Sequence, residues 1–182
     1  MAVFFVAFLA SARAGVDFTP EAGERTLEGV VFKQIVFHQD RHRISYEQPR
    51  GWSYTGDAGS VRLTPPGVSQ ARATIEQSPL PAPEVFDDAT TTRLRQQVLA
   101  LAPSGAQNVT VVSEEKNPLR INQQDTYAVT VAYSFYGQDY ELCEIFADLK
   151  DTQLRFRTVA RKTDFEKMNR AFRASLFTLA WQ

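Results

Sequence analysis

Apolar and polar residues alternate most strictly between residues 126 and 135, where the segment reads TYAVTVAYSF. Its large side chains share one face, and small side chains share the other. Because successive side chains of a strand point to opposite faces, this pattern predicts a β-strand with one buried face. The short polar breaks YGQD and LKDTQ separate it from the two strand-like segments that follow. Breaks of that length are typical of antiparallel hairpins, so we expect a meander.

The first half of the chain contains shorter strand-like segments. Two β-rich segments, GVVFKQIVFHQD and RISYEQP, are separated by a short polar stretch, which is the sequence form of a hairpin. Pro49 and Gly51 end the second segment, because proline lacks the N–H that a strand ladder needs and glycine breaks the pattern. We expect two further short strands in VRLTPP and ARATIEQSPL.

Residues 87–103 have the pattern of an amphipathic helix. Asp87 or Asp88 can cap its start, and Pro103 ends it. The apolar residues at helical spacing are Leu94, Val98 and Leu101. The opposite face is polar, so the helix is expected to lie on an apolar surface.

A second helix is predicted near the end of the chain, over residues 163–179. Thr163 or Asp164 can cap it. Its apolar stripe consists of Phe165, Met168, Phe172 and Leu176. The stripe is narrow and continuous, which again indicates a helix that covers part of a sheet.

Together these elements predict an α+β fold: an antiparallel β-sheet with helices packed on its faces. No repeat, low-complexity tract or linker interrupts the sequence, so residues 29–182 are expected to form a single domain. Residues 15–28 contain Gly, Pro and charged residues without periodicity. This composition predicts a flexible lead-in.

The first residues, MAVFFVAFLASARAG, read as an export signal. Ala2 to Ala10 form an apolar stretch, and Ala12-Arg13-Ala14 is a small-x-small cleavage pattern before Gly15. The basic segment that normally precedes such a stretch is missing, so either the true start lies upstream or the signal is atypical. We expect residues 1–14 to be a signal peptide and the mature protein to be periplasmic or secreted.

The composition limits the classes of protein to which this chain can belong. The chain is 43% hydrophobic and 23% charged, with a net charge of -1, which is typical of a globular protein. The balanced charge offers no broad attraction to nucleic acid, so no nucleic-acid partner is expected. Beyond the first residues, no apolar run is long enough to span a bilayer.

The order of segments resembles a known family. A strand ending in YEQPRGW, two short strands, a helix, the long aromatic meander and the closing helix DFEKMNRAFRASL look like the Mog/PsbP-type α/β/α sandwich. The resemblance covers residues 30–179 and rests on core and turn positions. It implies the fold above, in a bacterial exported member of unknown function.

The resemblance also implies a way of working. The better-known members are not general enzymes: one binds the photosystem II assembly, and another binds the GTPase Ran. We therefore expect a non-enzymatic protein-binding or assembly-accessory domain, whose partner is an unknown envelope or extracellular protein. No cofactor is expected.

Three aromatic residues are candidate partner contacts. Trp52 follows a Pro-x-Gly turn, and Tyr136 and Tyr140 flank the YGQD turn. Large aromatic side chains are enriched at protein interfaces when they are exposed. The alternative is ordinary packing: Trp52 at a sheet edge and the tyrosines across neighbouring strands.

A second hypothesis concerns metal or small-ligand binding. His38, Asp40 and His42 are spaced two residues apart, which on a continuous strand would place all three on one face. If the chain turns within QDRH, that common face is lost. The residue types allow a metal site, and the hairpin argues against it.

Catalytic motifs are absent from the sequence. No serine nucleophile elbow, glycine-rich phosphate loop or paired-cysteine motif is present. Cys143 is the only cysteine, in the alternating segment YELCEIFADL, where it is expected to be a buried small hydrophobe. The sequence therefore favours a binding protein over an enzyme.

Overall fold

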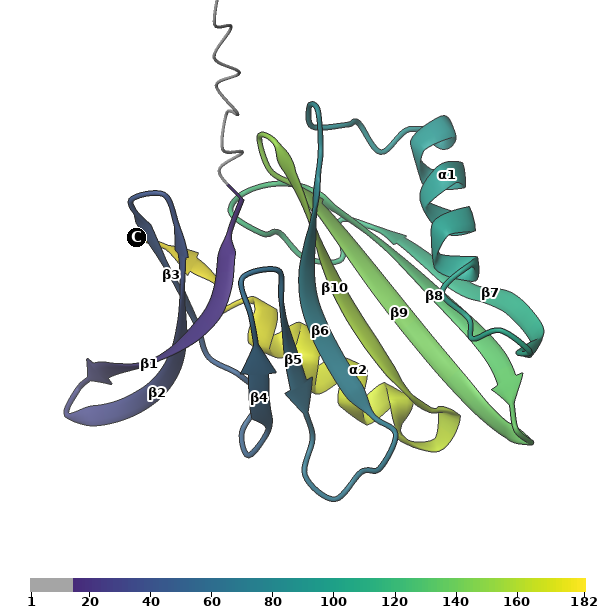
Figure 1. Cartoon of the computed structure of the whole chain (residues 1–182), viewed down its shortest axis with the longest axis horizontal. Helices are drawn as coiled ribbons and strands as arrows, with labels where there is room; N and C mark the ends of the chain where they lie inside the picture. Colours follow the sequence, from purple (N-terminus) through teal and green to yellow (C-terminus); the bar gives the residue numbers. More distant parts are fainter. Residues whose placement is uncertain (1–14) are drawn as a thin grey trace, which may run out of the picture.

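The computed structural model describes residues 15–182, so the predicted signal peptide, residues 1–14, lies outside the described residues. The elements are β1 (Asp17–Leu27), β2 (Val30–Gln39), β3 (His42–Tyr46), β4 (Ser53–Gly56), β5 (Ser60–Thr64), β6 (Arg72–Pro79), α1 (Asp88–Leu99), β7 (Gln107–Lys116), β8 (Thr126–Phe135), β9 (Gln138–Asp148), β10 (Thr152–Arg161), α2 (Lys162–Leu176) and β11 (Ala180–Trp181) (Figure 1). Neither helix is long and apolar enough to cross a bilayer.

The large sheet has seven strands in the order β4-β5-β6-β10-β9-β8-β7. Strands β7 to β10 follow one another, so the predicted meander is confirmed. The one non-sequential neighbour is β6, which pairs antiparallel with β10 from Arg72↔Val159 to Pro79↔Thr152. That pairing joins the β4–β6 hairpins to the meander in one sheet.

The small sheet has the order β1-β2-β3-β11 and includes residues for which a flexible lead-in was expected. That expectation is wrong, because Asp17 to Leu27 pair along β2. The alternation was hidden by a register irregularity between Asp17 and Glu21 and by the exposed outer residues of an edge strand. Pro20 fits there because an edge strand does not need every N–H.

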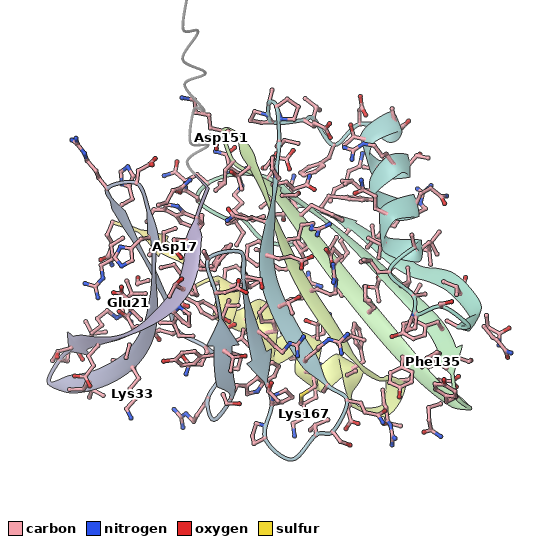
Figure 2. The ribbon with its side chains drawn as sticks, in the orientation of Figure 1. Asp17, Glu21, Lys33, Phe135, Asp151 and Lys167 are labelled. Carbon is pink, nitrogen blue, oxygen red and sulfur yellow. The ribbon has the colours of Figure 1, made fainter. Side chains whose placement is uncertain are left out.

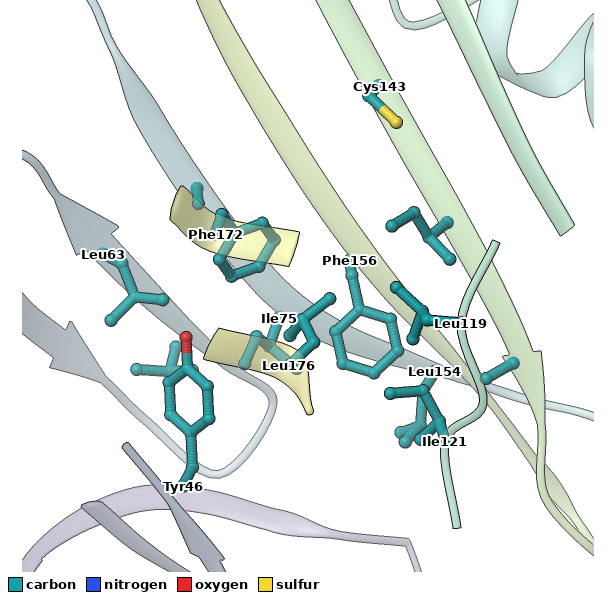
Figure 3. Close-up of a cluster of buried hydrophobic side chains, with 14 of the residues drawn as sticks. Tyr46, Leu63, Ile75, Leu119, Ile121, Cys143, Leu154, Phe156, Phe172 and Leu176 are labelled. Atoms are coloured by element: carbon teal, nitrogen blue, oxygen red, sulfur yellow. The ribbon is translucent and has the colours of Figure 1, made fainter. Parts of the chain in front are cut away.

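The two helices lie on opposite faces of the large sheet. Leu94 and Val98 of α1 pack on Tyr127, Val129 and Val131 of β8, the large face predicted from the sequence. On the other face, α2 and the small sheet cover a second core, whose central side chains are shown in Figure 3. This helix–sheet–helix order confirms the α+β fold class.

The N-terminal cap of α1 is the one predicted from the sequence, whereas the cap of α2 is not. Asp87 caps α1, and its carboxylate accepts a hydrogen bond from the Thr90 N–H at 2.8 Å. In α2 the cap is Arg161, with no side-chain hydrogen bond, so the expected cap at Thr163 or Asp164 is wrong. The reason is that α2 begins directly after β10. Asp164 therefore falls within the first turn of the helix, where its negative charge interacts favourably with the helix dipole.

Phe18 tests whether the first strand is part of the folded core. Its side chain is 2% exposed, and its ring packs edge-on against Phe37 at 5.3 Å. We predict that Phe18→Ala lowers the free energy of unfolding by about 3 kcal/mol in urea titrations, because a buried aromatic is removed.

Leu27→Ala is the matched control, since Leu27 lies on the same strand and is largely exposed. It is expected to change the free energy of unfolding by less than about 0.5 kcal/mol. Equal small effects of both substitutions would mean that β1 contributes little to the core.

Candidate functional site

The histidine segment forms a hairpin that separates the three predicted metal ligands. In the β2–β3 ladder His38 pairs with Arg43, and Gln39 pairs with His42. Directly paired residues share a face and neighbouring residues do not, so His38 and His42 lie on opposite faces. Asp40 lies in the turn, with φ at 53°.

His38 contacts a carboxylate of the neighbouring strand β1. Its Nε2 lies 3.2 Å from Oε2 of Glu21 on β1, and both side chains are well exposed. Within residues 15–182, no three His, Cys, Asp or Glu side chains are grouped as a metal site would require. The structure therefore does not bring His38, Asp40 and His42 together.

Trp52 is a core residue, so the expectation that it contacts a partner is wrong. Only 7% of the residue is exposed, and it packs in the core beneath the large sheet. Its N–H donates to the Pro49 carbonyl at 3.0 Å, which closes the Pro-x-Gly turn. Gly51 has φ at 80°, a conformation that explains why glycine stands there.

Tyr140 packs across neighbouring strands, which is the alternative to a partner contact, but it is not fully buried. Its ring stacks on Tyr133 across the β8–β9 ladder, with centroids 5.5 Å apart and planes 13° apart. Its hydroxyl donates to Oε1 of Gln70. The residue is partly buried, so part of its surface stays accessible.

Tyr136 is the predicted partner residue that the structure leaves exposed. Phe135 pairs with Gln138, so the hairpin loop consists of Tyr136 and Gly137, with φ at 47° and 70°. Two positive φ angles in a two-residue loop define a type I′ turn. Tyr136 is 90% exposed, and its ring packs against that of the neighbouring Phe135, with centroids 4.4 Å apart. Figure 2 labels Phe135 near the end of this hairpin.

A tyrosine at this turn position is unfavourable for folding. Asn, Asp and Gly adopt positive φ readily, whereas a bulky residue there costs about 1 kcal/mol. Exposure removes the compensating gain from burial. Folding therefore does not explain why residue 136 is a tyrosine.

A groove with a volume of about 660 Å³ lies between α2 and strands β7–β9. Val112 of β7 and Phe177, just after α2, are apolar lining residues that are 53% and 68% exposed. Asn169 of α2 also lines it, and its Oδ1 is buried without a hydrogen-bond partner. The sequence pattern missed this groove because α2 and β7 lie side by side only in the folded chain.

One ion pair bridges the two walls of the groove. Nη1 and Nη2 of Arg173 on α2 donate to the two carboxylate oxygens of Glu115 on β7, at 2.8 and 3.0 Å. These bonds hold the pKa of Glu115 below its ordinary value and raise that of Arg173.

The thiol under this face is inert. Cys143 is fully buried, which raises the pKa of its thiol to about 11 and keeps it protonated. Burial of this cysteine was expected from the sequence and is confirmed. Both histidines lie on the small sheet, away from it, so the groove does not present a thiol–histidine pair.

The Glu115–Arg173 bridge predicts a specific loss of stability in acid. Since the folded state lowers the pKa of Glu115, its contribution is present above the ordinary pKa of a glutamate and disappears as the pH falls through the folded value. We expect Glu115→Gln to cost about 0.5–1 kcal/mol at pH 7 and almost nothing near pH 2, measured by urea unfolding.

Glu166→Gln is the control, because Glu166 pairs with Arg170 within one helix and both are highly exposed. It should cost at most about 0.5 kcal/mol at pH 7. A difference for Glu115→Gln that stays constant with pH would contradict a role for its charge.

Comparisons with known proteins establish similarity of fold. No family model matches the chain, and no curated protein matches it. Among solved structures, LpqN of Mycobacterium tuberculosis, described as involved in cell envelope biogenesis, has a TM-score of 0.50 at 13% identity, over 78% of this chain and 84% of that chain.

Two other solved structures resemble the chain less closely by TM-score. A protein of unknown function from Pseudomonas aeruginosa, PA94, has a TM-score of 0.46 at 13% identity, over 87% of this chain and 96% of that chain. The PsbP protein (CyanoP) of Synechocystis has 0.49 at 10% identity, over 91% and 94%. The chain therefore shares the fold of LpqN.

Proposed function

We propose that this protein is a non-enzymatic, extracytoplasmic binding protein that attaches to another protein of the envelope or extracellular space through the β8–β9 hairpin. The observation that carries the proposal is Tyr136: a fully presented aromatic ring in a turn conformation that disfavours it. A residue that is unfavourable for folding and exposed to solvent is best explained by a contact outside the chain.

The hairpin is suited to hold such a contact. Its strands are fully paired up to Phe135↔Gln138, so Tyr136 projects from a short, rigid loop. Tyrosine contributes a large contact area for few rotatable bonds, and rigid presentation reduces the entropy lost on binding. The ring of Phe135 packs against that of Tyr136, which stays 90% exposed.

The extracytoplasmic location is supported by two observations. The sequence begins with an apolar stretch and a small-x-small cleavage pattern. The fold is shared with LpqN, a protein described as involved in cell envelope biogenesis. The metal-binding alternative has less support, since the two histidines of the small sheet lie on opposite faces.

Tyr136→Asn should separate folding from binding. Asparagine suits the first position of a type I′ turn, so we expect the free energy of unfolding to stay equal or to rise by up to about 1 kcal/mol. Binding to the partner should weaken at least about 30-fold, the size of an aromatic hot spot. The partner is first captured by photo-crosslinking from residue 136 in the source cells, and its affinity is then measured with purified proteins.

Glu28→Asn is a matched control. Glu28 and Gly29 form the β1–β2 loop with φ at 51° and 80°, the same turn geometry in another hairpin. This variant should gain similar stability and keep full affinity. Identical crosslinked species from residues 28 and 136, or equal affinities of both variants, would overturn the proposed site.

A further inference from the structure

The uncovered part of the large sheet carries a set of arginines that no function above uses. Strand alternation and register place Arg62 of β5, Arg72 of β6, and Arg155, Arg157 and Arg161 of β10 on one face. We call this surface the arginine face. It is the same side that α1 covers, but the main contacts of α1 are with β7 and β8, and Figure 1 shows the helix away from β5 and β6.

Two of these arginines are fixed and neutralised. Oε1 of Glu76 accepts from Nη2 of both Arg155 and Arg157, each at 2.7 Å. Glu144, which is fully buried, accepts from Nε and Nη2 of Arg157 at 2.6 and 3.1 Å. The carboxylates therefore hold both guanidinium groups flat against the sheet.

This network has more donors than acceptors. Each guanidinium carries several N–H groups, whereas the carboxylates only accept. Within residues 15–182, three buried side-chain polar atoms have no hydrogen-bond partner, and two of them, Oγ1 of Thr74 and Nε of Arg155, belong here. Thr74 lies directly opposite Arg157 on β6. Ligands that only accept hydrogen bonds, such as oxyanions, match this imbalance.

The remaining three arginines supply unbalanced charge. Arg62, Arg72 and Arg161 take part in none of the ion pairs found in the described part of the chain. They lie on three neighbouring strands about 5 Å apart, and the register offsets each arginine from the next by two residues, about 7 Å in the strand direction. A protein whose net charge is -1 thus gathers positive charge on one open surface.

The end of the arginine face carries an aromatic side chain. Arg161 pairs across the ladder with Tyr140, which stacks on Tyr133. Oε1 of Gln70 accepts from the Tyr140 hydroxyl and from Nε of Arg161, the latter at 3.2 Å. An aromatic edge beside guanidinium and amide groups can contact both the apolar and the polar parts of a sugar ring.

From this surface we infer that the arginine face binds an acidic polysaccharide. An open strand surface with spaced cations suits an extended chain that makes several moderate contacts, because it cannot enclose a small anion. Within residues 15–182, the large exposed hydrophobic side chains all lie outside β5, β6 and β10, which disfavours insertion into a lipid surface. The even overall charge gives no broad attraction to nucleic acid, so binding is expected to depend on the local arginines and on the aromatic contact at Tyr140.

Titration with defined probes tests the inference. Polygalacturonate and heparin are the acidic polysaccharides, dextran is the neutral control, and oligothymidylate and phosphatidylglycerol vesicles represent the other polyanions. The protein should bind both acidic polysaccharides at low salt, more weakly as salt rises, and should not bind dextran. Combined Arg62→Gln, Arg72→Gln and Arg161→Gln should weaken this binding at least tenfold.

A second triple variant removes the same charge elsewhere. Lys33, Arg41 and Arg50 are exposed and lie on or next to the small sheet. Changing all three to Gln should alter the affinity less than twofold. Thermal unfolding must show that both variants are folded. Equal losses in the two triple variants, no binding at low salt, or tighter binding to DNA or to vesicles than to polysaccharide would overturn the inference.

Discussion

The antiparallel pairing of β6 with β10 is the constraint on which the rest of the structure depends. It joins segments about eighty residues apart, and such a contact must be offset by burial because closing the loop costs chain entropy. Ile75 and Phe156, paired across this ladder, are both fully buried and supply that burial on the α2 side. On the opposite side the same ladder is held by Glu76 and the arginines of β10.

This ladder also decides where the surface features lie. Because β10 is central, α2 starts at its end and must cross the back of the sheet, where it forms one wall of the groove. Because the main contacts of α1 are with β7 and β8, no helix covers the front of β5 and β6, and only Val159 of β10 joins the core under α1. A buried carboxylate such as Glu144 is tolerated there since Arg157 bonds to both of its oxygens.

Sequence patterns predicted the parts of the fold that depend on neighbours in the chain. The meander followed from alternation, and α1 from its cap and stripe, because both signals are local. β1 was missed, since its bulge and exposed edge hide the period. The hypothesis of a histidine cluster does not fit the structure, because the turn at Asp40 places His38 and His42 on opposite faces of the hairpin. The groove and the arginine face depend on contacts between distant segments, so no local pattern could show them.

Tyr136 and the arginine face lie near the same end of the sheet yet differ in chemistry. Tyr140 stands between them: its ring turns inward onto Tyr133, and its hydroxyl faces Gln70. Tyr136 is 90% exposed in the loop beyond the last paired residues of the hairpin, whereas Arg161 bonds to Gln70. A protein partner at the hairpin would therefore leave the arginines accessible. Since the rigid β8–β9 ladder links the two surfaces without an element that has two arrangements, we expect their binding energies to be nearly additive.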